Sequence, residues 1–316
     1  MINNVPLNNK LIIICGSTAS GKTYIAEKFA LEYGMEIISA DSMQIYKDMD
    51  IGTAKAKNLK VKQHMIDIVK PNDEYNVFMY QKDVKSIINN TKNASEQYVV
   101  CGGTGLYIDS LYYKMNFGHG IEKENMELKN KLDDILEKHG KQYIYNLLMM
   151  SDPEAAKQLH PNNSRRVLRA LYLVTLYEQP LSRIQTRKIN DGIKLVILHT
   201  NRECLRQRVE NRVEEMVKMG LVDEVKMLIE KYNLTFQNQS FQGIGYKEWE
   251  SYLLGNADME STKKLIITNT MQYAKRQTTW FNNRYKNNLI KIDTTSLYDD
   301  ESEILKQISN FVLNTI

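Results

Sequence analysis

The sequence predicts an α/β protein, with a parallel sheet core, helices on both faces of the sheet and a helical insertion domain. Three observations predict this fold. Short apolar runs alternate with amphipathic helical patterns, a glycine-rich loop joins the first run to its helix, and the alternation stops between residues 119 and 191. We therefore expect one core made of residues 1–118 and 192–316, interrupted by a helical insertion at 119–191.

Composition excludes several classes of protein. Of the 316 residues, 42% are hydrophobic and 25% are charged, which is typical of a globular chain and not of a disordered one. The three cysteines form no C-x-x-C pair, so neither a zinc finger nor a disulfide framework is expected. Met1–Asn9 lacks the pattern of a signal peptide, and no apolar run approaches the roughly 20 residues that cross a bilayer. We expect a cytoplasmic protein without membrane contact.

The first strand, helix and intervening loop carry the strongest motif. An apolar strand at 11–15 precedes a G-x-x-x-x-G-K-T loop, and a helical pattern follows at 24–33. This arrangement aims backbone N–H groups at an anion, with Lys22 adding a charge and the Thr23 hydroxyl able to ligate Mg²⁺. An ordinary glycine-rich turn is the alternative, but all four fixed positions and both flanks match. The core is therefore expected to be P-loop NTPase-like and to bind a diphosphate or polyphosphate through Gly16, Ser17, Thr18, Ala19, Ser20, Gly21, Lys22 and Thr23.

Two further strands end in polar residues. The strand at 35–39 leads to Asp41, and the strand at 98–101 leads to Gly102, Gly103 and Thr104. Carboxyl ends of parallel strands are where ligands bind, so Asp41 is placed to act on the molecule that carries the phosphate. Asp41 could instead cap the next short helix, and the glycines before Thr104 could form a simple turn into a helix at 106–113.

The remaining elements are expected from apolar periodicity. A short strand is expected near 63–68, a helix at 78–90, a strand at 193–199, a strand at 289–293 and a terminal helix at 301–313. The insertion is expected to contain helices at 123–139, 142–149, 153–159 and 165–178.

Cations cluster in three places. Residues 141–190 carry 8 Lys and Arg against 3 Asp and Glu, and three of the arginines, Arg165, Arg166 and Arg169, share the exposed side of one helix. A solvated basic helix face is the alternative. Arg208 and Arg212 are spaced to complete a diphosphate site, or to pair with neighbouring glutamates at 203, 210 and 214.

The third cluster is near the C-terminus. Residues 261–286 hold 6 Lys and Arg and no acid, and Tyr273, Trp280 and Phe281 lie among these cations. Charge combined with stacking surface predicts an RNA-binding helix. A glycine-punctuated loop at 241–248 precedes it.

The motifs together resemble the tRNA dimethylallyltransferase family. The resemblance rests on G-S-T-A-S-G-K-T at 16–23, A-D-S-M-Q-I-Y at 40–46, D-I-G-T-A-K at 50–55, H-M-I-D-I at 64–68, G-G-T-G-L-Y at 102–107, H-P-N-N at 160–163, R-R-V-L-R-A-L at 165–171, Q-G-I-G-Y-K-E at 242–248 and Q-Y-A-K-R-Q-x-x-W-F at 272–281. They span nearly the whole chain in the family's order. Ser17, Gln63, Gly243 and Asn282 depart from common family residues, at positions that are not catalytic.

The resemblance implies a reaction and a set of roles. The enzyme would transfer the dimethylallyl group of dimethylallyl diphosphate to the N6 amine of the adenosine 3′ to the anticodon, with Mg²⁺ as cofactor. Asp41 would accept the proton, and Thr104 would contact substrate at the reacting end. Lys22 and Arg212, with Mg²⁺ ligated by Thr23, would stabilise the charge on the leaving diphosphate, and Arg208 would help to bind it. The tRNA would be bound by Asp41, Ser42, Met43, Gln44, Thr104, Arg165, Arg166, Val167, Leu168, Arg169, Gln242, Gly243, Ile244, Gly245, Tyr246, Lys247, Lys275 and Arg276. A monomer is expected.

Three other functions share parts of this pattern. A small-molecule kinase would use the same loop for ATP, and a prenyltransferase of free adenine nucleotides would need no basic helix at 261–286. A nucleotide-gated RNA-binding module would leave Asp41 without a role.

Overall fold

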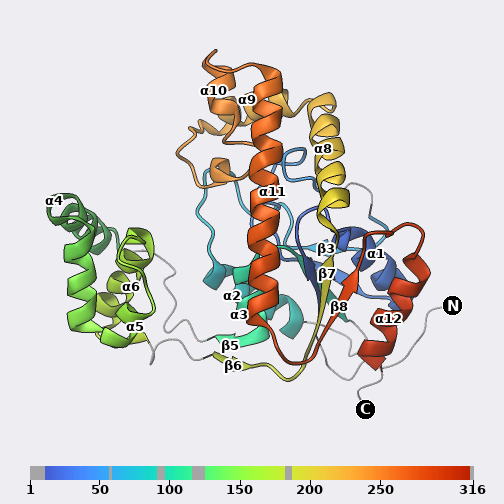
Figure 1. The fold of residues 1–316 in the computed structure, drawn as a ribbon, viewed down its shortest axis with the longest axis horizontal. Coiled ribbons are helices and arrows are strands. Elements are labelled where there is room, and N and C mark those ends of the chain that lie inside the picture. The colour runs from blue at the N-terminus through green and yellow to red at the C-terminus, as the bar shows by residue number, and fades with distance from the viewer. Residues whose placement is uncertain (1–10, 57–58, 91–96, 116–124, 182–186, 314–316) are drawn as a thin grey trace. The chain divides into compact units, whose positions relative to one another are not determined.

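The computed structural model describes residues 11–56, 59–90, 97–115, 125–181 and 187–313 (Figure 1). The chain divides into two compact units. The first unit comprises Met1–Asp109 with Asp191–Ile316, and the second comprises Ser110–Asn190. Residues 1–9, where no signal peptide was expected, lie outside the described residues.

A six-stranded sheet forms the centre of the first unit. Its strand order is β3-β2-β4-β1-β7-β8 and every pairing is parallel, which confirms the predicted α/β class. The strands are β1 (Leu11–Gly16), β2 (Glu36–Ser39), β3 (Gln63–His64), β4 (Tyr98–Gly102), β7 (Ile193–His199) and β8 (Leu289–Asp293). β1 lies between β4 and β7, so the loop that follows it emerges at the middle of the sheet.

Helices cover both faces of β1. Ile12 and Ile14 share a core with α1 (Lys22–Tyr33) and α12 (Glu301–Leu313), which lie together beside the sheet in Figure 1. Alternate residues of a strand point to opposite faces, so Ile13 faces the other side, where α11 (Met259–Arg284) contacts β1. All three isoleucines are fully buried, which explains the unbroken apolar run of this strand.

Further helices of the first unit are α2 (Val77–Asn89), α8 (Arg202–Lys218), α9 (Leu221–Tyr232) and α10 (Trp249–Leu253), with a short 3-10 helix at Ser240–Gln242. The helix α3 (Gly105–Tyr112) begins in the first unit and ends in the second. The helix at 221–232 was not among the elements expected from the sequence, although Leu221, Val225 and Leu228 are buried at helical spacing. None of the helices in the described part of the chain is long and apolar enough to cross a membrane.

The second unit is mainly helical. It contains α4 (Met126–Ser151), α5 (Pro153–Lys157) and α6 (Ser164–Tyr177), with a small antiparallel ribbon of β5 (Tyr113–Met115) and β6 (Arg187–Ile189) that the sequence did not suggest. Gly140 has a φ of 80° inside α4 and breaks the helix where two separate helices were predicted. Leu132, Ile144, Leu148 and Leu171 are among the residues that form its own core.

Candidate active site

The glycine-rich loop after β1 is built to receive an anion. Ala19 and Gly21 have φ angles of 61° and 84°, so the backbone twice adopts a left-handed conformation within the loop. A Cβ on Gly16 would lie 2.5 Å from the Leu198 carbonyl oxygen, which leaves room for glycine alone. No side chain caps the N-terminus of α1 within the described residues, so its first-turn amides remain available for a ligand.

Two cations and one carboxylate face this loop. Lys22 Nζ donates to the Ser17 carbonyl at 3.1 Å, and Arg212 Nη1 of α8 donates to Thr18 Oγ1 at 3.3 Å. Burial lowers the pKa of Lys22, and the nearby Asp41 carboxylate partly opposes that shift. The pKa of Arg212 is also lowered by burial and is raised by Asp41. The loop is thus electropositive, with Asp41 as its nearby counter-charge.

Arg208, one turn before Arg212 on α8, has a different place from the one predicted. Its Nη2 donates to the carbonyls of Thr294 and Thr295 at 2.8 and 3.1 Å, and its Nη1 contacts Thr200 and the Ala19 carbonyl at 3.4 Å each. The guanidinium is therefore used by backbone and hydroxyl oxygens, and Arg208 does not line the cavity described below. This placement supports a structural role and not the predicted contact with diphosphate.

The loops that carry Asp41 and Thr104 are held together. The Thr104 amide donates to the Ala40 carbonyl at 3.1 Å, and Thr104 Oγ1 accepts from the Ser42 amide at 2.9 Å. A Cβ on Gly102 would lie 2.2 Å from the Ala40 carbonyl oxygen, so only glycine allows the two strand ends to approach. Asp41 Oδ1 accepts from the Met43 amide at 2.9 Å, which fixes the orientation of its carboxylate.

A cavity of about 660 Å³ opens in the first unit beside these loops. It brings together residues that were predicted to bind diphosphate and residues that were predicted to bind the acceptor. The predicted residues among its lining are Thr18, Asp41, Ser42, Met43, Thr104, Arg212, Gln242, Gly243, Ile244, Gly245, Lys247 and Arg276. Thr18 of the phosphate loop, the Asp41 carboxylate and the exposed Arg276 therefore line the same cavity.

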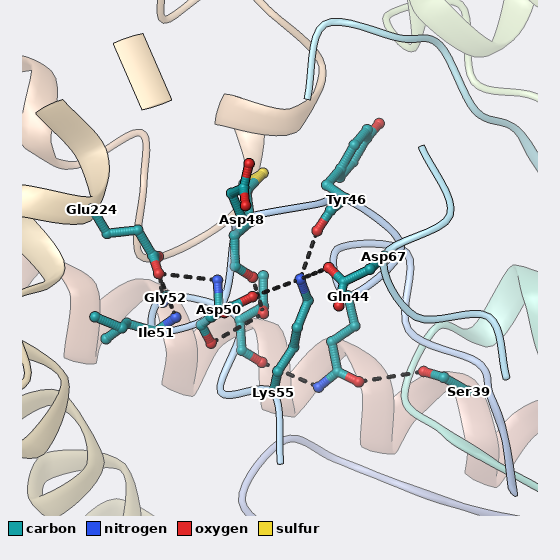
Figure 2. A network of polar contacts seen from close by, with 12 residues as sticks. Ser39, Gln44, Tyr46, Asp48, Asp50, Ile51, Gly52, Lys55, Asp67 and Glu224 are labelled. Carbon is teal, nitrogen blue, oxygen red and sulfur yellow. Dashed lines mark hydrogen bonds and ion pairs between the residues drawn. The ribbon is translucent and has the colours of Figure 1, made fainter. Parts of the chain in front are cut away.

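Two residues predicted to line the cavity point elsewhere. The Gln44 amide accepts from Ser39 Oγ at 3.3 Å and donates to the Thr53 carbonyl at 3.2 Å, so both of its ends are engaged (Figure 2). Tyr246 is fully buried and donates to Glu224 Oε1 at 2.7 Å. Both residues support the walls of the cavity from behind, because their neighbours in sequence take the positions that face it.

Two of the three aromatic residues of α11 that were predicted to stack on bases, Trp280 and Phe281, pack inside the protein instead. Phe281 is 1% exposed, and Trp280 packs so closely on α3 that a Cβ on Gly105 would lie 2.5 Å from its Nε1. Arg284 lies over the Trp280 ring at 3.8 Å and donates to buried Asp109 at 2.6 Å. Packing against α3 uses these side chains. Lys275 and Arg276 are exposed, as an RNA contact requires.

Sequence reasoning missed Gln277 of α11 at the site, whereas Tyr273 of the same helix was among the predicted stacking residues. Gln277 Oε1 accepts from the Thr18 amide at 2.8 Å, and its Nε2 donates to the Gly103 carbonyl at 2.8 Å. It therefore joins the phosphate loop to the Thr104 loop. Tyr273 lines the cavity, and burial together with the Asp41 carboxylate raises its pKa to about 12. Both belong to the quoted Q-Y-A-K-R-Q-x-x-W-F motif, which was the available signal.

The arginine cluster of the second unit lies at the start of α6. Arg165, Arg166 and Arg169 are exposed, and Arg169 lies over the Tyr172 ring at 5.3 Å. The predicted RNA contact through Val167 is wrong, because this side chain is fully buried in the core of the unit. Leu168 also packs against that core, so both apolar residues hold the helix in place.

The residues near the phosphate loop fit a magnesium ion that is coordinated mostly by the oxygens of a bound diphosphate. Thr23 places a hydroxyl in the first turn of α1, beside Lys22. Within the described residues no group of three His, Cys, Asp or Glu side chains could hold a metal by itself. Magnesium retains waters and commonly takes phosphate oxygens together with one or two protein oxygens, so Thr23 and a diphosphate suit it.

Comparison with known proteins identifies the family. The model of the IPP transferase family matches residues 44–284, and that of the isopentenyl transferase family matches residues 9–68. The chain is 40% identical to a tRNA dimethylallyltransferase of Halothermothrix orenii over 99% of this chain and 96% of that protein. It is also 40% identical to a tRNA dimethylallyltransferase of Bacillus licheniformis, over 87% and 88% of the two chains.

Solved structures of the same kind of enzyme are also similar to this chain. The full-length tRNA isopentenylpyrophosphate transferase of Bacillus halodurans is similar with a TM-score of 0.69 and 34% identity, over 96% of this chain and 97% of that one. A eukaryotic dimethylallyltransferase acting on tRNA is similar with a TM-score of 0.84 and 29% identity, over 96% and 80%. Together with the phosphate loop and the shared cavity, these likenesses show that the chain belongs to the IPP transferase family.

Proposed function

We propose that this chain is a tRNA-modifying transferase. It moves the dimethylallyl group of dimethylallyl diphosphate to the N6 amine of the adenosine immediately 3′ of the anticodon and releases diphosphate. One observation carries the proposal: a single cavity is lined by Thr18 of the phosphate loop, by Arg212 and by Asp41. Diphosphate binding and a proton acceptor for an amine are therefore available in one cavity.

The donor end of the cavity is the phosphate loop. Its backbone amides, the Lys22 ammonium and the Arg212 guanidinium bind the diphosphate and stabilise the negative charge that develops as it leaves. Burial lowers the pKa of Lys22, and a bound anion favours its charged form. Mg²⁺, when bound through the Thr23 hydroxyl and the diphosphate oxygens, would neutralise part of the same charge.

The acceptor reaction is a substitution at the first carbon of the allyl group. The bond from this carbon to the N6 nitrogen forms as its bond to the diphosphate oxygen breaks. Asp41 takes the proton that the amine releases, and its carboxylate is oriented by the Met43 amide at 2.9 Å. Thr104 holds the Asp41 loop through the Ser42 amide at 2.9 Å and lines the cavity beside it.

RNA would reach the cavity as an unstacked base. Enzymes that modify a base take it out of the stack and into a pocket. Lys247 and Arg276 line the cavity and supply positive charge for the flanking phosphates. In the second unit, exposed Arg165, Arg166 and Arg169 are suited to phosphates of the same RNA. We propose that the protein acts as a monomer in the cytoplasm.

The test is transfer of radiolabel from dimethylallyl diphosphate to an anticodon stem-loop RNA, with Mg²⁺ and without ATP. Label on the RNA that disappears when the target adenosine is replaced would establish donor, acceptor and site together. Label on free AMP instead of RNA would contradict the RNA substrate. No label transfer in this assay, together with ATP hydrolysis in a parallel assay that contains ATP, would contradict the transferase reaction.

A further inference from the structure

We infer that Glu224 is a positioning residue, which fixes one wall of the cavity in the shape that receives the acceptor base. That wall is formed by Gly52, Thr53 and Ala54, in the segment 50–54, and is not part of the phosphate loop. Glu224 lies on α9 and is 8% exposed. The inference rests on the proposed transfer to RNA and deepens it, because it names what shapes the acceptor side of the cavity.

The Glu224 carboxylate gathers three consecutive backbone amides. Its Oε2 accepts from the amides of Asp50 and Ile51 at 3.0 and 2.7 Å, and its Oε1 accepts from the Gly52 amide at 3.1 Å (Figure 2). The Tyr246 hydroxyl adds a fourth hydrogen bond at 2.7 Å. Consecutive amides that converge on an anion form a nest, so this carboxylate dictates the backbone conformation of the loop.

Burial makes this arrangement interdependent. A buried carboxylate costs free energy unless hydrogen bonds replace its lost water. Within the described residues Glu224 has no ion pair, so the three amides and the phenol are what stabilise its charge. The loop therefore keeps its shape because Glu224 is there, and Glu224 tolerates burial because the loop keeps its shape.

Lys55 anchors the other end of the segment. Its Nζ donates to the Tyr46 carbonyl at 2.6 Å and to Asp50 Oδ1 at 2.9 Å, and it also pairs with Asp67 (Figure 2). The Lys55 side chain is only 6% exposed. Ala54, between the two anchors, has a φ of 50°, which a non-glycine residue adopts only when its surroundings impose it.

The segment held in this way faces the cavity. Gly52, Thr53 and Ala54 line it, as do Gly245 and Lys247 on either side of Tyr246. Gly52 and Tyr246 are in close contact, since a Cβ on Gly52 would lie 2.4 Å from the ring. Glu224 thus supports two wall segments at once through Gly52 and Tyr246. Its described hydrogen bonds involve no residue of the phosphate loop at 16–23.

The test variant is Glu224→Gln. The new amide nitrogen is best placed toward Tyr246, whose hydroxyl can accept, and this leaves the Gly52 amide facing a donor. We expect the KM for the stem-loop RNA to rise about tenfold or more, because a buried amide loses its acceptor. The Kd for dimethylallyl diphosphate should change less than about twofold, and Glu230→Gln, an exposed position of α9, should change neither.

Two further measurements decide between outcomes. Hydrogen exchange should speed up at the amides of Asp50, Ile51 and Gly52 in Glu224→Gln but not along β1. Faster exchange with an unchanged KM for RNA, or an equal loss of donor and RNA binding, would overturn the inference.

If Glu224→Gln does not fold, the variant Tyr246→Phe provides the test, since it keeps the three amide hydrogen bonds to Glu224. A rise of about threefold in the RNA KM alone supports the inference, and no change overturns it. A wild-type protein that never labels RNA would instead refute the proposed function.

Discussion

Neighbouring residues after β2 take up different roles. Asp41 lines the cavity, whereas Gln44, three residues later, bonds to Ser39 and Thr53 behind the cavity wall. Both are polar, and the sequence placed both at the ligand. The difference arises because successive side chains of the short turn after β2 point in different directions. The cavity lies on the side of the turn that faces the Thr104 loop, which binds the Ser42 amide.

Replacing Asp41 with Asn tests the proton acceptor. Asn keeps an oxygen that can accept from the Met43 amide, now at 2.9 Å, so the loop should stay in place. The rate of transfer should fall by about 10²- to 10⁴-fold, because a positioned general base is lost, while RNA and donor binding stay nearly intact. Single-turnover transfer and separate binding titrations measure the two effects. A parallel loss of RNA affinity would argue against the assigned role.

A second residue-scale prediction concerns Tyr80 of α2. Its ring stacks on Tyr107 with centroids 3.9 Å apart, and its hydroxyl is buried with no hydrogen-bond partner among the described residues. Tyr80→Phe keeps the stack and removes the unsatisfied group, so the free energy of unfolding should rise by about 1 kcal/mol. Urea unfolding checks this. A decrease would show that the hydroxyl has a partner in solution.

At the scale of elements, α8 and α11 assemble the site. α8 carries Arg212 over the phosphate loop and Arg208 against the end of β8. α11 carries Gln277, whose amide joins Thr18 to Gly103 across two loops. Arg208 and Arg212 lie one turn apart on the same face of α8, yet one supports the fold and the other faces the phosphate loop, because successive turns of the helix meet different neighbours.

The arginines of α8 form a matched pair. Arg212→Gln should raise the Kd for dimethylallyl diphosphate about tenfold or more, because a charge-assisted contact is lost, with little change in stability. Arg208→Gln should lower the free energy of unfolding by about 1–3 kcal/mol, because buried carbonyls lose their donor, and should leave the Kd nearly unchanged. Calorimetric binding and thermal unfolding of both variants give the comparison. A larger loss of donor affinity in Arg208→Gln than in Arg212→Gln would reverse the assignment.

At the scale of the whole molecule, buried tyrosines link stability to pH. Burial raises the pKa values of Tyr46 and Tyr273 to about 12, and those of Tyr75, Tyr107 and Tyr285 are raised further by burial and by acidic neighbours. These phenols stay protonated in the folded chain at a pH where the unfolded chain ionises, near 10. Above that pH the folded state binds more protons than the unfolded state.

The free energy of unfolding should therefore decrease as the pH rises from about 10 to 12. Each such tyrosine contributes about 1.4 kcal/mol per pH unit within this window. Urea unfolding midpoints, measured by circular dichroism at about pH 9, 10 and 11, test the prediction, because these values span the pH at which an unfolded tyrosine begins to ionise. Midpoints that stay constant would contradict it.

The sequence by itself determined the local features of this protein. The strand, glycine loop and helix around Lys22 and the apolar runs of the parallel strands are encoded in contiguous residues. The polar residues Asp41 and Thr104 follow from the same pattern, because parallel strands end at one edge of the sheet. The interruption of α4 at Gly140 could also be predicted from the sequence, since glycine is unfavourable inside a helix.

Only the tertiary structure decided which side chains face the ligand. Gln277 reaches Thr18 across 259 positions of sequence, and Glu224 reaches the amide of Gly52 across 172. Such contacts leave no periodic or local signal, so Tyr246 and Gln44 were placed at the cavity when they support it from behind. The physical reason is that a loop without side-chain periodicity takes its orientation from its packing partners, and those partners come from distant parts of the chain.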